Sequence, residues 1–301
     1  MPSRKLRILV ARHSAFYSPL IATLSGGFLD RQGIEASYGV LPAGARSRDL
    51  LRSGEVDIVQ SAVSSSWGPL EQGESDLPVH FAQINQRDGF FLAARRPDSA
   101  FDWKKLQGAT LLADHGSQPL AMLKYAAWRQ GVDWGQIRVV DAGDVEQIDA
   151  AFRAGQGDYV HQQGPAPQQL EHDRVGWVVA SVGEAMPAVA FSSLSGTREF
   201  LRTDQAARFL AAYAEARIWA RRAPASDVAQ AEAGFFPGIA PAALQAAIAR
   251  YQHLGCWEGD LAIERSLYQQ ALEVFFHSGL IRRRYAYEEV VANPVDLEGP
   301  I

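Results

Sequence analysis

A ten-residue stretch that occurs twice is the feature that most constrains this sequence. The first copy, RSGEVDIVQS, runs from Arg52 to Ser61, and the second, RAGQGDYVHQ, runs from Arg153 to Gln162. Arg, Gly, Asp and Val recur at the same four places in both copies. Glycine adopts the left-handed conformation that ends a helix, and the short apolar run after the aspartate is typical of a buried strand. Each copy therefore predicts a helix end followed at once by a strand.

The elements around the two copies follow the same order. The first pass along the chain predicts strands at 6–11, 34–40 and 57–59, joined by helices at 19–29 and 43–52 and by a loop that contains His13. The second pass predicts strands at 109–113, 137–140 and 158–160, joined by helices at 118–129 and 144–153 and by a loop that contains His115. Strands that alternate with helices form parallel sheets with right-handed crossovers. The sequence therefore predicts an α/β fold with two similar lobes.

Further strands and a helical C-terminal part complete this prediction. Strands at 79–85 and 90–94 are expected to complete lobe one and lead out of it, and strands at 177–180 and 188–191 are expected to do the same for lobe two. After Thr197 the pattern is mostly helical, over 198–222, 241–254 and 261–278, and such a part is expected to pack on lobe one. We predict that lobe one comprises 1–94 and 192–301, that lobe two comprises 95–191, and that a ligand cleft lies between them.

Composition and charge exclude several classes of protein. The chain has 301 residues, 47% apolar and 21% charged, so it can bury a full core. Its net charge of -5 argues against a nucleic-acid partner. The single cysteine, Cys256, excludes a disulfide within the chain and a cysteine-based zinc site. We expect Cys256 to be a packed thiol rather than a nucleophile.

The N-terminal sequence bears on localisation. Arg4, Lys5 and Arg7 imitate the basic start of a signal peptide, but the apolar run Ile8–Ala11 is shorter than the roughly 7–15 residues that a signal needs. No window approaches the roughly 20 apolar residues of a membrane span. As written, the chain is expected to stay in the cytoplasm, and to be periplasmic if a signal peptide has been removed.

Catalytic and cofactor motifs are absent from the sequence. It has no GxSxG elbow, no GxxxxGK[ST] phosphate loop and no GxGxxG after a strand. His13, His115 and His161 come from three different strand ends and lack the i, i+4 pairing of a helical metal site. We therefore expect no cofactor, no metal site and no assigned catalytic residue.

The candidate ligand site follows from the predicted sheets. In open α/β sheets, ligands bind outside the carboxyl ends of the strands, which here would face the cleft between the lobes. The candidates are His13, Ser14, Phe16, Tyr17, Gln60, Ser61, Trp67 and Asn85 from lobe one, and His115, Gly116, Ser117, His161, Gln162 and Glu184 from lobe two.

Two features within this set favour particular contacts. Phe16, Tyr17 and Trp67 can stack on a planar ring, or alternatively belong to the core. Gly116 and Ser117 stand at a helix start, where free N–H groups favour an anion or a carbonyl oxygen, although Ser117 can also serve only as a helix cap. Both readings stay open from the sequence alone.

Several segments resemble a known family. They are Tyr17-Ser18-Pro19-Leu20, Gly27-Phe28-Leu29-Asp30-Arg31-Gln32-Gly33-Ile34-Glu35, Gly54-Glu55-Val56-Asp57-Ile58, Trp103–Gly108 and Phe276–Ile281. With them the chain resembles the type II periplasmic-binding-protein-like family over nearly its whole length. The likeness is to the branch that binds aliphatic sulfonates, taurine, nitrate and thiamine-pyrimidine precursors. It implies two lobes that close on a small ligand and deliver it to an ABC transporter permease.

The sequence also departs from this family. The usual export signal is absent, and the branch includes cytoplasmic enzymes. A fungal synthase of the thiamine pyrimidine has a cysteine-rich run where this chain has Glu184–Phe191, without cysteine. The nucleophilic cysteine of a desulfinase matches Ser14 here, and serine lacks thiolate nucleophilicity.

Three hypotheses follow. The first is a substrate-binding component of an ABC importer, or a relative of one, that closes on a small planar or anionic ligand of the sulfonate or pyrimidine type. The alternative is a cytoplasmic enzyme on the same scaffold, desulfinase-like or thiamine-pyrimidine-synthesis-like, in which His13, Ser14 or His161 would transfer protons. A cytoplasmic sensor is the third.

Overall fold

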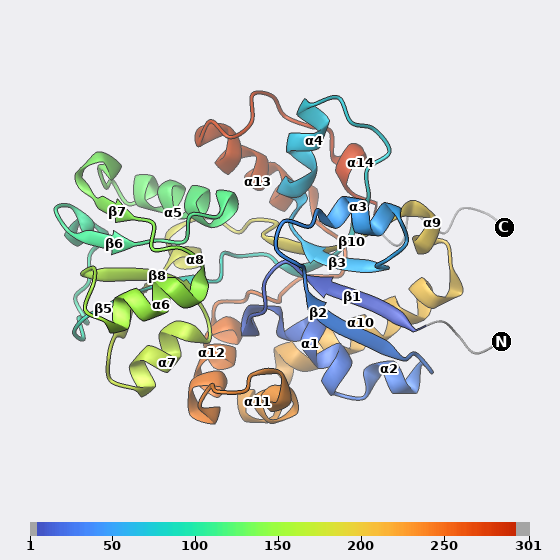
Figure 1. Cartoon of the computed structure of the whole chain (residues 1–301), viewed down its shortest axis with the longest axis horizontal. Coiled ribbons are helices and arrows are strands. Elements are labelled where there is room, and N and C mark those ends of the chain that lie inside the picture. Colours follow the sequence, from blue (N-terminus) through green and yellow to red (C-terminus); the bar gives the residue numbers. More distant parts are fainter. Residues whose placement is uncertain (1–4, 293–301) are drawn as a thin grey trace.

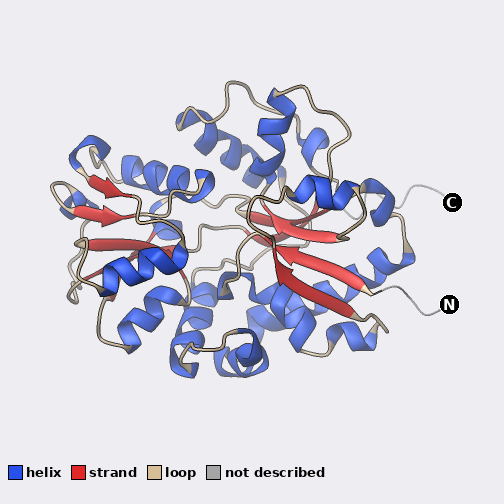
Figure 2. Cartoon of the chain, in the orientation of Figure 1, coloured by secondary structure: helices blue, strands red, loops and turns tan. Residues whose placement is uncertain are grey.

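The chain folds into two α/β lobes, each built on a five-stranded sheet. The computed structural model describes residues 5–292, so the predictions that fall on residues 1–4 and 293–301 lie outside the described residues. Figure 2 shows the strands gathered in two separate groups, with helices around each group. The predicted two-lobe α/β architecture is confirmed.

The sheet of lobe one, sheet A, has the strand order β2-β1-β3-β10-β4. Its strands are β1 (Leu6–Val10), β2 (Ala36–Val40), β3 (Ile58–Ser61), β4 (Val79–Asn85) and β10 (Ser192–Gly196). Strand β1 is parallel to β2 and β3, whereas β10 is antiparallel to β3 and β4. The helical elements of this lobe before the crossing are η1 (Ala15–Tyr17, a 3-10 helix), α1 (Ser18–Ser25), α2 (Phe28–Arg31), α3 (Ser47–Arg52), η2 (Val63–Ser66) and α4 (Trp67–Glu71).

The sheet of lobe two, sheet B, repeats this plan with the order β7-β6-β8-β5-β9. Its strands are β5 (Phe90–Ala94), β6 (Thr110–Leu112), β7 (Arg138–Val140), β8 (Tyr159–Gln163) and β9 (Trp177–Ser181). Strand β6 is parallel to β7 and β8, and β5 is antiparallel to β8 and β9. The helical elements are η3 (Trp103–Leu106), α5 (Ser117–Arg129), η4 (Trp134–Gln136), α6 (Val145–Arg153), α7 (Ala166–His172) and α8 (Val182–Ala185).

The first strand after each crossing of the chain between the lobes belongs to the lobe that the chain enters. This finding corrects the predicted boundaries of the lobes. Residues 90–94 were expected in lobe one, but they form β5 in the middle of sheet B. Residues 188–191 were expected to form a strand, but the strand is β10, which begins at Ser192 and belongs to sheet A. The crossings from sheet A to sheet B and back therefore lie at 86–89 and within 182–191.

The repeated ten-residue stretch forms the same joint in both lobes. Gly54 and Gly155 have positive φ angles of 69° and 92°, as expected of glycines that end helices. Asp57 then accepts the backbone N–H of Arg7 in β1 at 2.8 Å, and Asp158 accepts that of Thr110 in β6 at 2.7 Å. The aspartate of each copy thus fastens the start of its own strand to the neighbouring strand of the sheet.

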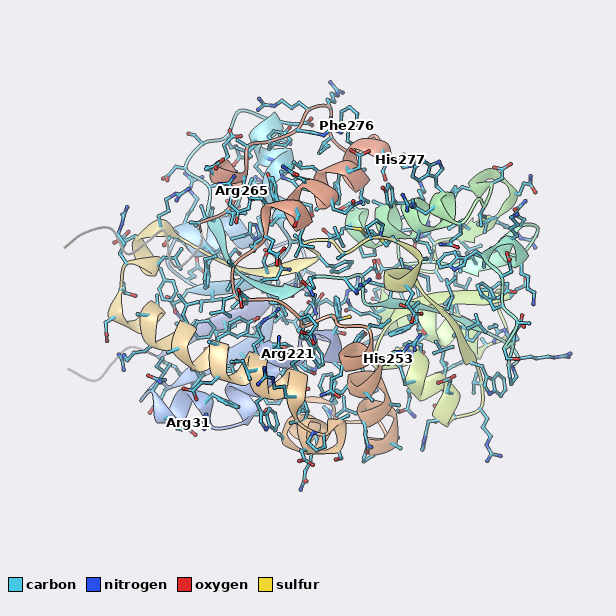
Figure 3. The ribbon with its side chains drawn as sticks, turned by 180° about the vertical axis from the view of Figure 1, so that it is seen from behind. Arg31, Arg221, His253, Arg265, Phe276 and His277 are labelled. Carbon is cyan, nitrogen blue, oxygen red and sulfur yellow. The ribbon has the colours of Figure 1, made fainter. Side chains whose placement is uncertain are left out.

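The C-terminal helices pack mainly on lobe one, as predicted, but two of them also reach lobe two. They are α9 (Arg198–Leu201), α10 (Asp204–Arg222), α11 (Ala225–Glu232), η5 (Ala233–Phe235), α12 (Pro241–His253), α13 (Arg265–His277) and α14 (Tyr287–Val290). Helices α10 and α11 contact α1 in lobe one, whereas α12 contacts α7 and α13 contacts α5 in lobe two. In Figure 3, His277 marks the end of α13 beside α5, and its ring centroid lies 4.4 Å from that of Trp128.

The two crossing segments are bonded to each other. The N–H of Val189 donates to the carbonyl of Gln86 at 2.8 Å, and the N–H of Phe191 donates to the carbonyl of Asn85 at 3.1 Å. The side-chain amide of Asn85 donates to the carbonyl of Phe16 at 2.7 Å, which ties the segments to η1. The connection between the lobes is therefore a hydrogen-bonded pair of segments and not two independent linkers.

Gly183 provides a test of how tightly this connection is packed. A Cβ atom added at Gly183 would stand 2.3 Å from the backbone oxygen of Asp88 in the other crossing segment. We expect Gly183→Ala to lower the free energy of unfolding by about 1–3 kcal/mol, because backbone must move to admit the methyl group. At Gly68, in α4, an added Cβ meets nothing within 4 Å, so Gly68→Ala is the matched control. Urea denaturation followed by circular dichroism measures both, and equal midpoints for the two variants would contradict the expectation.

Candidate functional site

Opposite charges meet where the first strand of each lobe ends. Arg12 follows β1 and Asp114 follows β6, and their side chains form an ion pair between the lobes. Burial by itself would raise the pKa of Asp114, but the hydrogen bond and charge of Arg12 outweigh it and hold that pKa below its usual value. The N–H of Gly116 also donates to Asp114 Oδ1 at 2.8 Å. The strand ends of the two lobes are thus joined by a partly buried ion pair.

Two further hydrogen bonds cross between the lobes near this pair. Ser64 Oγ in η2 donates to Gln118 Oε1 in α5 at 2.6 Å. Ser14 Oγ donates to the carbonyl of Gly164, just after β8, at 2.5 Å. The strand ends of the two lobes are therefore in direct contact, which is a closed arrangement of the two sheets.

A cavity of about 340 Å³ lies beside these contacts, between the lobes. Its lining comes from both lobes and from the C-terminal part: Arg12, His13, Ser14, Val145, Gln163, Gly164, Pro165, Ala166, Phe235, Phe236, Pro237 and Ile239. The volume falls within the range of about 300–1,000 Å³ that small-molecule pockets occupy. Its walls are mainly apolar, with a few polar groups at the strand ends.

His13 forms part of the wall as a neutral side chain. Its Nε2 lies 2.7 Å from the carbonyl oxygen of Phe235, which can only accept, so Nε2 carries the hydrogen. Its Nδ1 lies 2.7 Å from the hydroxyl of Tyr38 and therefore accepts from it. Burial lowers the pKa of His13, and its ring stacks on Phe236 at 4.5 Å between centroids. Both nitrogens are occupied, so His13 positions the turn at 235–236 and has no free nitrogen for proton transfer.

His161, in β8, is a buried imidazole with no hydrogen-bond partner. Its side chain is 0% exposed, and within residues 5–292 neither Nδ1 nor Nε2 has a partner. The ring stacks on Phe90 with centroids 4.5 Å apart, and burial lowers its pKa to about 3, so the ring is neutral. Leaving a buried polar group unsatisfied costs about 1–3 kcal/mol. Such a group is expected where a ligand or an ordered water completes the site.

Asp88 adds a second unpartnered atom close to the crossing. Its Oδ1 accepts the N–H of Phe90 at 2.6 Å, while Oδ2 is buried and has no partner among the described residues. Burial, with a smaller contribution from the charge of Asp114, raises the pKa of Asp88 to about 8. The Asp88 carboxyl group is therefore mostly protonated at neutral pH and can donate a hydrogen bond.

The structure brings only part of the predicted site together. His13 and Ser14 line the cavity, and the side chain of Tyr17 lies near that of the cavity residue Gln163. His161 carries the unpartnered nitrogens in the same strand as Gln163. These four predicted residues stay candidates for ligand contact.

Other predicted residues are tied to the scaffold. Phe16 and Asn85 are 0% exposed and bonded to each other in the connection between the lobes. Gln60 Oε1 accepts the N–H of Ala11 at 3.1 Å, and Ser61 Oγ lies 3.3 Å from Ser195 Oγ within sheet A. None of these four residues lines the cavity between the lobes.

In lobe two, Gln162 points away from His161 because side chains alternate along a strand, and it donates to Asp149 in α6 at 3.2 Å. His115, Gly116 and Ser117 are exposed. Gly116 is the N-cap of α5, and Ser117 is its first residue rather than its cap.

Trp67 and Glu184 lie away from the cavity, and both placements correct the prediction. Trp67 is fully buried between η2 and α13, where its Nε1 donates to the hydroxyl of Tyr268 at 3.2 Å. Glu184 is exposed and forms an ion pair of 2.8 Å with Arg250 in α12. No sequence signal distinguished Trp67, a core residue, from a residue of the cleft. The same holds for Glu184, which lies on the surface.

Arg12, Asp114, Asp88 and Gln163 were not among the predicted site residues. A signal for the first two is present in the sequence: Arg12-His13 and Asp114-His115 occupy the same place in the two repeats, with opposite charges before each histidine. Because equivalent strand ends of the two lobes face each other, opposite charges at equivalent positions predict an ion pair across the cleft. Asp88 and Gln163 carry no comparable pattern.

Comparisons with known proteins identify the architecture. YtlA of Bacillus subtilis (strain 168), which carries the name of a proposed binding protein, is 27% identical over 291 residues, covering 95% of this chain and 87% of YtlA. The ligand-binding component of an ABC-type import system from Staphylococcus aureus, solved with zinc bound, superposes with a TM-score of 0.77 at 14% identity over 98% of this chain and 99% of that one. The periplasmic aliphatic sulphonate binding protein SsuA from Escherichia coli gives a TM-score of 0.74 at 17% identity over 99% and 95%. No protein-family model matches the chain.

This chain has the periplasmic-binding-protein fold. The resemblance seen in the sequence is thereby confirmed at the level of the fold. Within residues 5–292, no helix of this periplasmic-binding-protein fold is long and apolar enough to cross a membrane. The same residues contain no group of His, Cys, Asp and Glu that could hold a metal ion.

Proposed function

We propose that this protein binds a small organic molecule in the cavity between its lobes, as the substrate-binding component of an ABC importer or a relative of one. The observation that carries the proposal is His161, a fully buried ring whose two nitrogens have no partner, in the strand that leads into a cavity of about 340 Å³. The names of the similar proteins support it, since they describe binding proteins and import components.

The walls of the cavity favour a planar ligand. Phe235, Phe236 and the His13 ring offer flat faces, and the polar groups are Arg12, Gln163 and the nearby His161. Arg12 is already paired with Asp114. A sulfonate would therefore have to take Arg12 from Asp114, whereas an uncharged ring of the pyrimidine type would leave the pair intact and hydrogen-bond to the unpartnered groups.

This function requires a permease as the partner. The side of the membrane on which the chain works then depends on whether it serves that permease. A chain that serves an importer works on the outer side of the membrane, whereas a chain that stays in the cytoplasm would act as an enzyme or a sensor. Cell fractionation with a tagged chain expressed from its own locus distinguishes the two locations.

The enzyme alternative receives less support from the side chains. Ser14 Oγ donates to the carbonyl of Gly164 and accepts the N–H of Phe16 at 3.1 Å, so its hydroxyl acts as a cap and a link between lobes. Burial raises the pKa of the Cys256 thiol well above its usual value, which disfavours the thiolate. His13 has no free nitrogen. We therefore assign binding, without turnover, to the cavity.

A ligand screen with one variant tests the proposal. Thermal shift against sulfonates, pyrimidines and aromatic acids should find a compound that raises Tm, since a ligand at about 100 times its Kd adds about 2.7 kcal/mol of stability. His161→Phe keeps the stacking on Phe90 but removes both ring nitrogens, and we expect it to weaken binding of that compound about tenfold or more.

The control is His253→Phe, at the exposed end of α12 (Figure 3), which should bind as the parent chain does. Recovery of the compound unchanged supports a binding protein, and chemical conversion would support the enzyme alternative. Unchanged affinity in His161→Phe would show that the cavity assignment is wrong.

A further inference from the structure

A second cavity, of about 250 Å³, lies within lobe one and shares no lining residue with the cavity between the lobes. It is formed on the face of sheet A that α3 and α4 cover (Figure 1). Its lining residues are Leu41, Ala45, Arg46, Ser47, Arg48, Leu51, Ser65, Ser66, Pro69, Leu77, Pro78, His80 and Ser195. We refer to it as the lobe-one cavity.

The charged residues that line the lobe-one cavity are both arginines, and no acid lines it. Arg48 forms an ion pair of 2.9 Å with Glu74, which lies outside the lining. Arg46 is exposed at the rim, with no ion pair to any described residue. The rim therefore presents one guanidinium whose charge is not offset by a carboxylate of the chain.

The floor of the lobe-one cavity is a set of polar groups around the buried side chain of His80. The Nδ1 of His80 lies 2.8 Å from Ser193 Oγ, a good hydrogen bond. Its Nε2 has only long contacts, at 3.5 Å, to the hydroxyls of Ser65 and Ser66. Burial lowers the pKa of His80 to about 3, so the ring stays neutral and offers a hydrogen bond rather than a charge. A ligand atom at Nε2 would improve on both long contacts.

An ion pair links the walls of the cavity across its opening. The Arg48–Glu74 pair joins α3 to the loop after α4, so it links the two elements that face each other across the opening. Ser195 Oγ donates to the carbonyl of Val59 at 3.0 Å, which fixes its position in the floor. Leu41, Leu51 and Pro69 add apolar surface to the lining.

We propose that the lobe-one cavity is a second ligand site that takes a small organic oxyanion, with its anionic oxygens at Arg46 and the serine hydroxyls and its short apolar part against Leu41 and Leu51. Apart from Ser195, whose hydroxyl already donates to Val59, the polar side chains that line it can donate a hydrogen bond, as the oxygens of a phosphate or carboxylate require. Its volume, smaller than that of the cavity between the lobes, restricts it to a compact molecule. This site is independent of the function proposed for the cavity between the lobes.

Titration of the full chain with inorganic phosphate and with propyl phosphate tests the proposal. Isothermal titration calorimetry should show saturable binding of both, with propyl phosphate the tighter because it covers the apolar wall. Arg46→Ala should weaken propyl phosphate binding about tenfold, through the loss of a charge-assisted hydrogen bond. Ser65→Ala, at an exposed hydroxyl, should weaken it by a smaller factor without affecting the fold.

The matched control is Arg52→Ala, which removes an exposed arginine at the end of α3, the helix whose N-cap is Arg46; Arg52 does not line the lobe-one cavity. Amide chemical shifts of ¹⁵N-labelled protein locate the bound probe, and we expect the changes around Ser65 and His80. Equal loss of affinity in Arg46→Ala and Arg52→Ala would overturn the proposal by showing only unspecific charge attraction. So would shifts confined to Arg12 and His161, or the absence of saturable binding by either probe.

Discussion

At pH 8 the variant Asp88→Asn is expected to be more stable than the parent chain, whereas at pH 4 the two are expected to be nearly equal in stability. Burial raises the pKa of Asp88 from 3.8 in the unfolded chain to about 8 in the folded chain. Between these two values the folded chain holds a proton that the unfolded chain releases. The stability that this proton provides is complete below the unfolded pKa and is lost as the pH rises through the folded pKa.

The expected difference in stability between the two proteins is large because the unfolded and folded pKa values of Asp88 are far apart. One such group changes the free energy of unfolding by up to about 1.4 kcal/mol per pH unit. Asparagine keeps the acceptor for the N–H of Phe90 but never ionises, so the variant loses this contribution to the slope. Glu232, whose pKa burial also raises, acts in the same direction and remains in both proteins. The quantity to follow is therefore the difference in the free energy of unfolding between the two proteins at each pH, and not the pH dependence of either protein alone.

Urea denaturation of both proteins from pH 4 to pH 8 measures that difference. Asp260→Asn, which removes an exposed carboxylate, is the control and is expected to follow the parent curve. If parent and Asp88→Asn give parallel curves, Asp88 is ionised in the folded chain and the connection between the lobes holds a buried negative charge.

Trp67→Ala is expected to lose about 3–5 kcal/mol of stability, the usual loss for a large aromatic residue removed from a core. Trp67 is 0% exposed, its ring centroid lies 4.9 Å from that of Phe275, and its Nε1 donates to Tyr268. It joins the start of α4 to helix α13, so its removal also loosens the C-terminal helices. Chemical denaturation of the variant measures the loss.

Two further variants separate the core role of Trp67 from a ligand role. Trp128, 53% exposed in α5, is the control: its ring contacts that of His277, and Trp128→Ala is expected to lose about 1 kcal/mol or less. Trp67→Phe should lose less stability than Trp67→Ala and should bind a compound found in the ligand screen as the parent does. Loss of that binding without loss of stability would restore Trp67 to the ligand site.

The lobes could be predicted because local sequence determines the joints that define them. Gly54 and Gly155 end helices, and Asp57 and Asp158 cap the neighbouring strand, so both copies of the repeat work through contacts within one lobe. The exchange of β5 and β10 between the sheets could not be predicted in this way. A buried apolar strand such as Phe90–Ala94 fits the middle of either sheet. Only its pairing with β8 and β9 shows that it belongs to sheet B.

The site was predicted less well than the fold, for a related reason. The position of a strand end can be inferred from sequence, which is why His13, Ser14, Tyr17 and His161 could be chosen as candidates for ligand contact. The direction of each side chain depends on packing between distant segments. Trp67 faces α13, which lies some two hundred residues further along the chain, and no local pattern encodes that choice.

The paired crossing segments limit how the two halves of the molecule can move. Because Val189 and Phe191 are bonded to Gln86 and Asn85, one segment cannot shift along the other without breaking these backbone hydrogen bonds. Sliding of one lobe over the other is therefore disfavoured, and the movement left to the molecule is a common bend or twist of both segments about one axis. Arg12 and Asp114 would then separate and rejoin along a single arc, so that a molecule entering the cavity meets the same two faces each time they close.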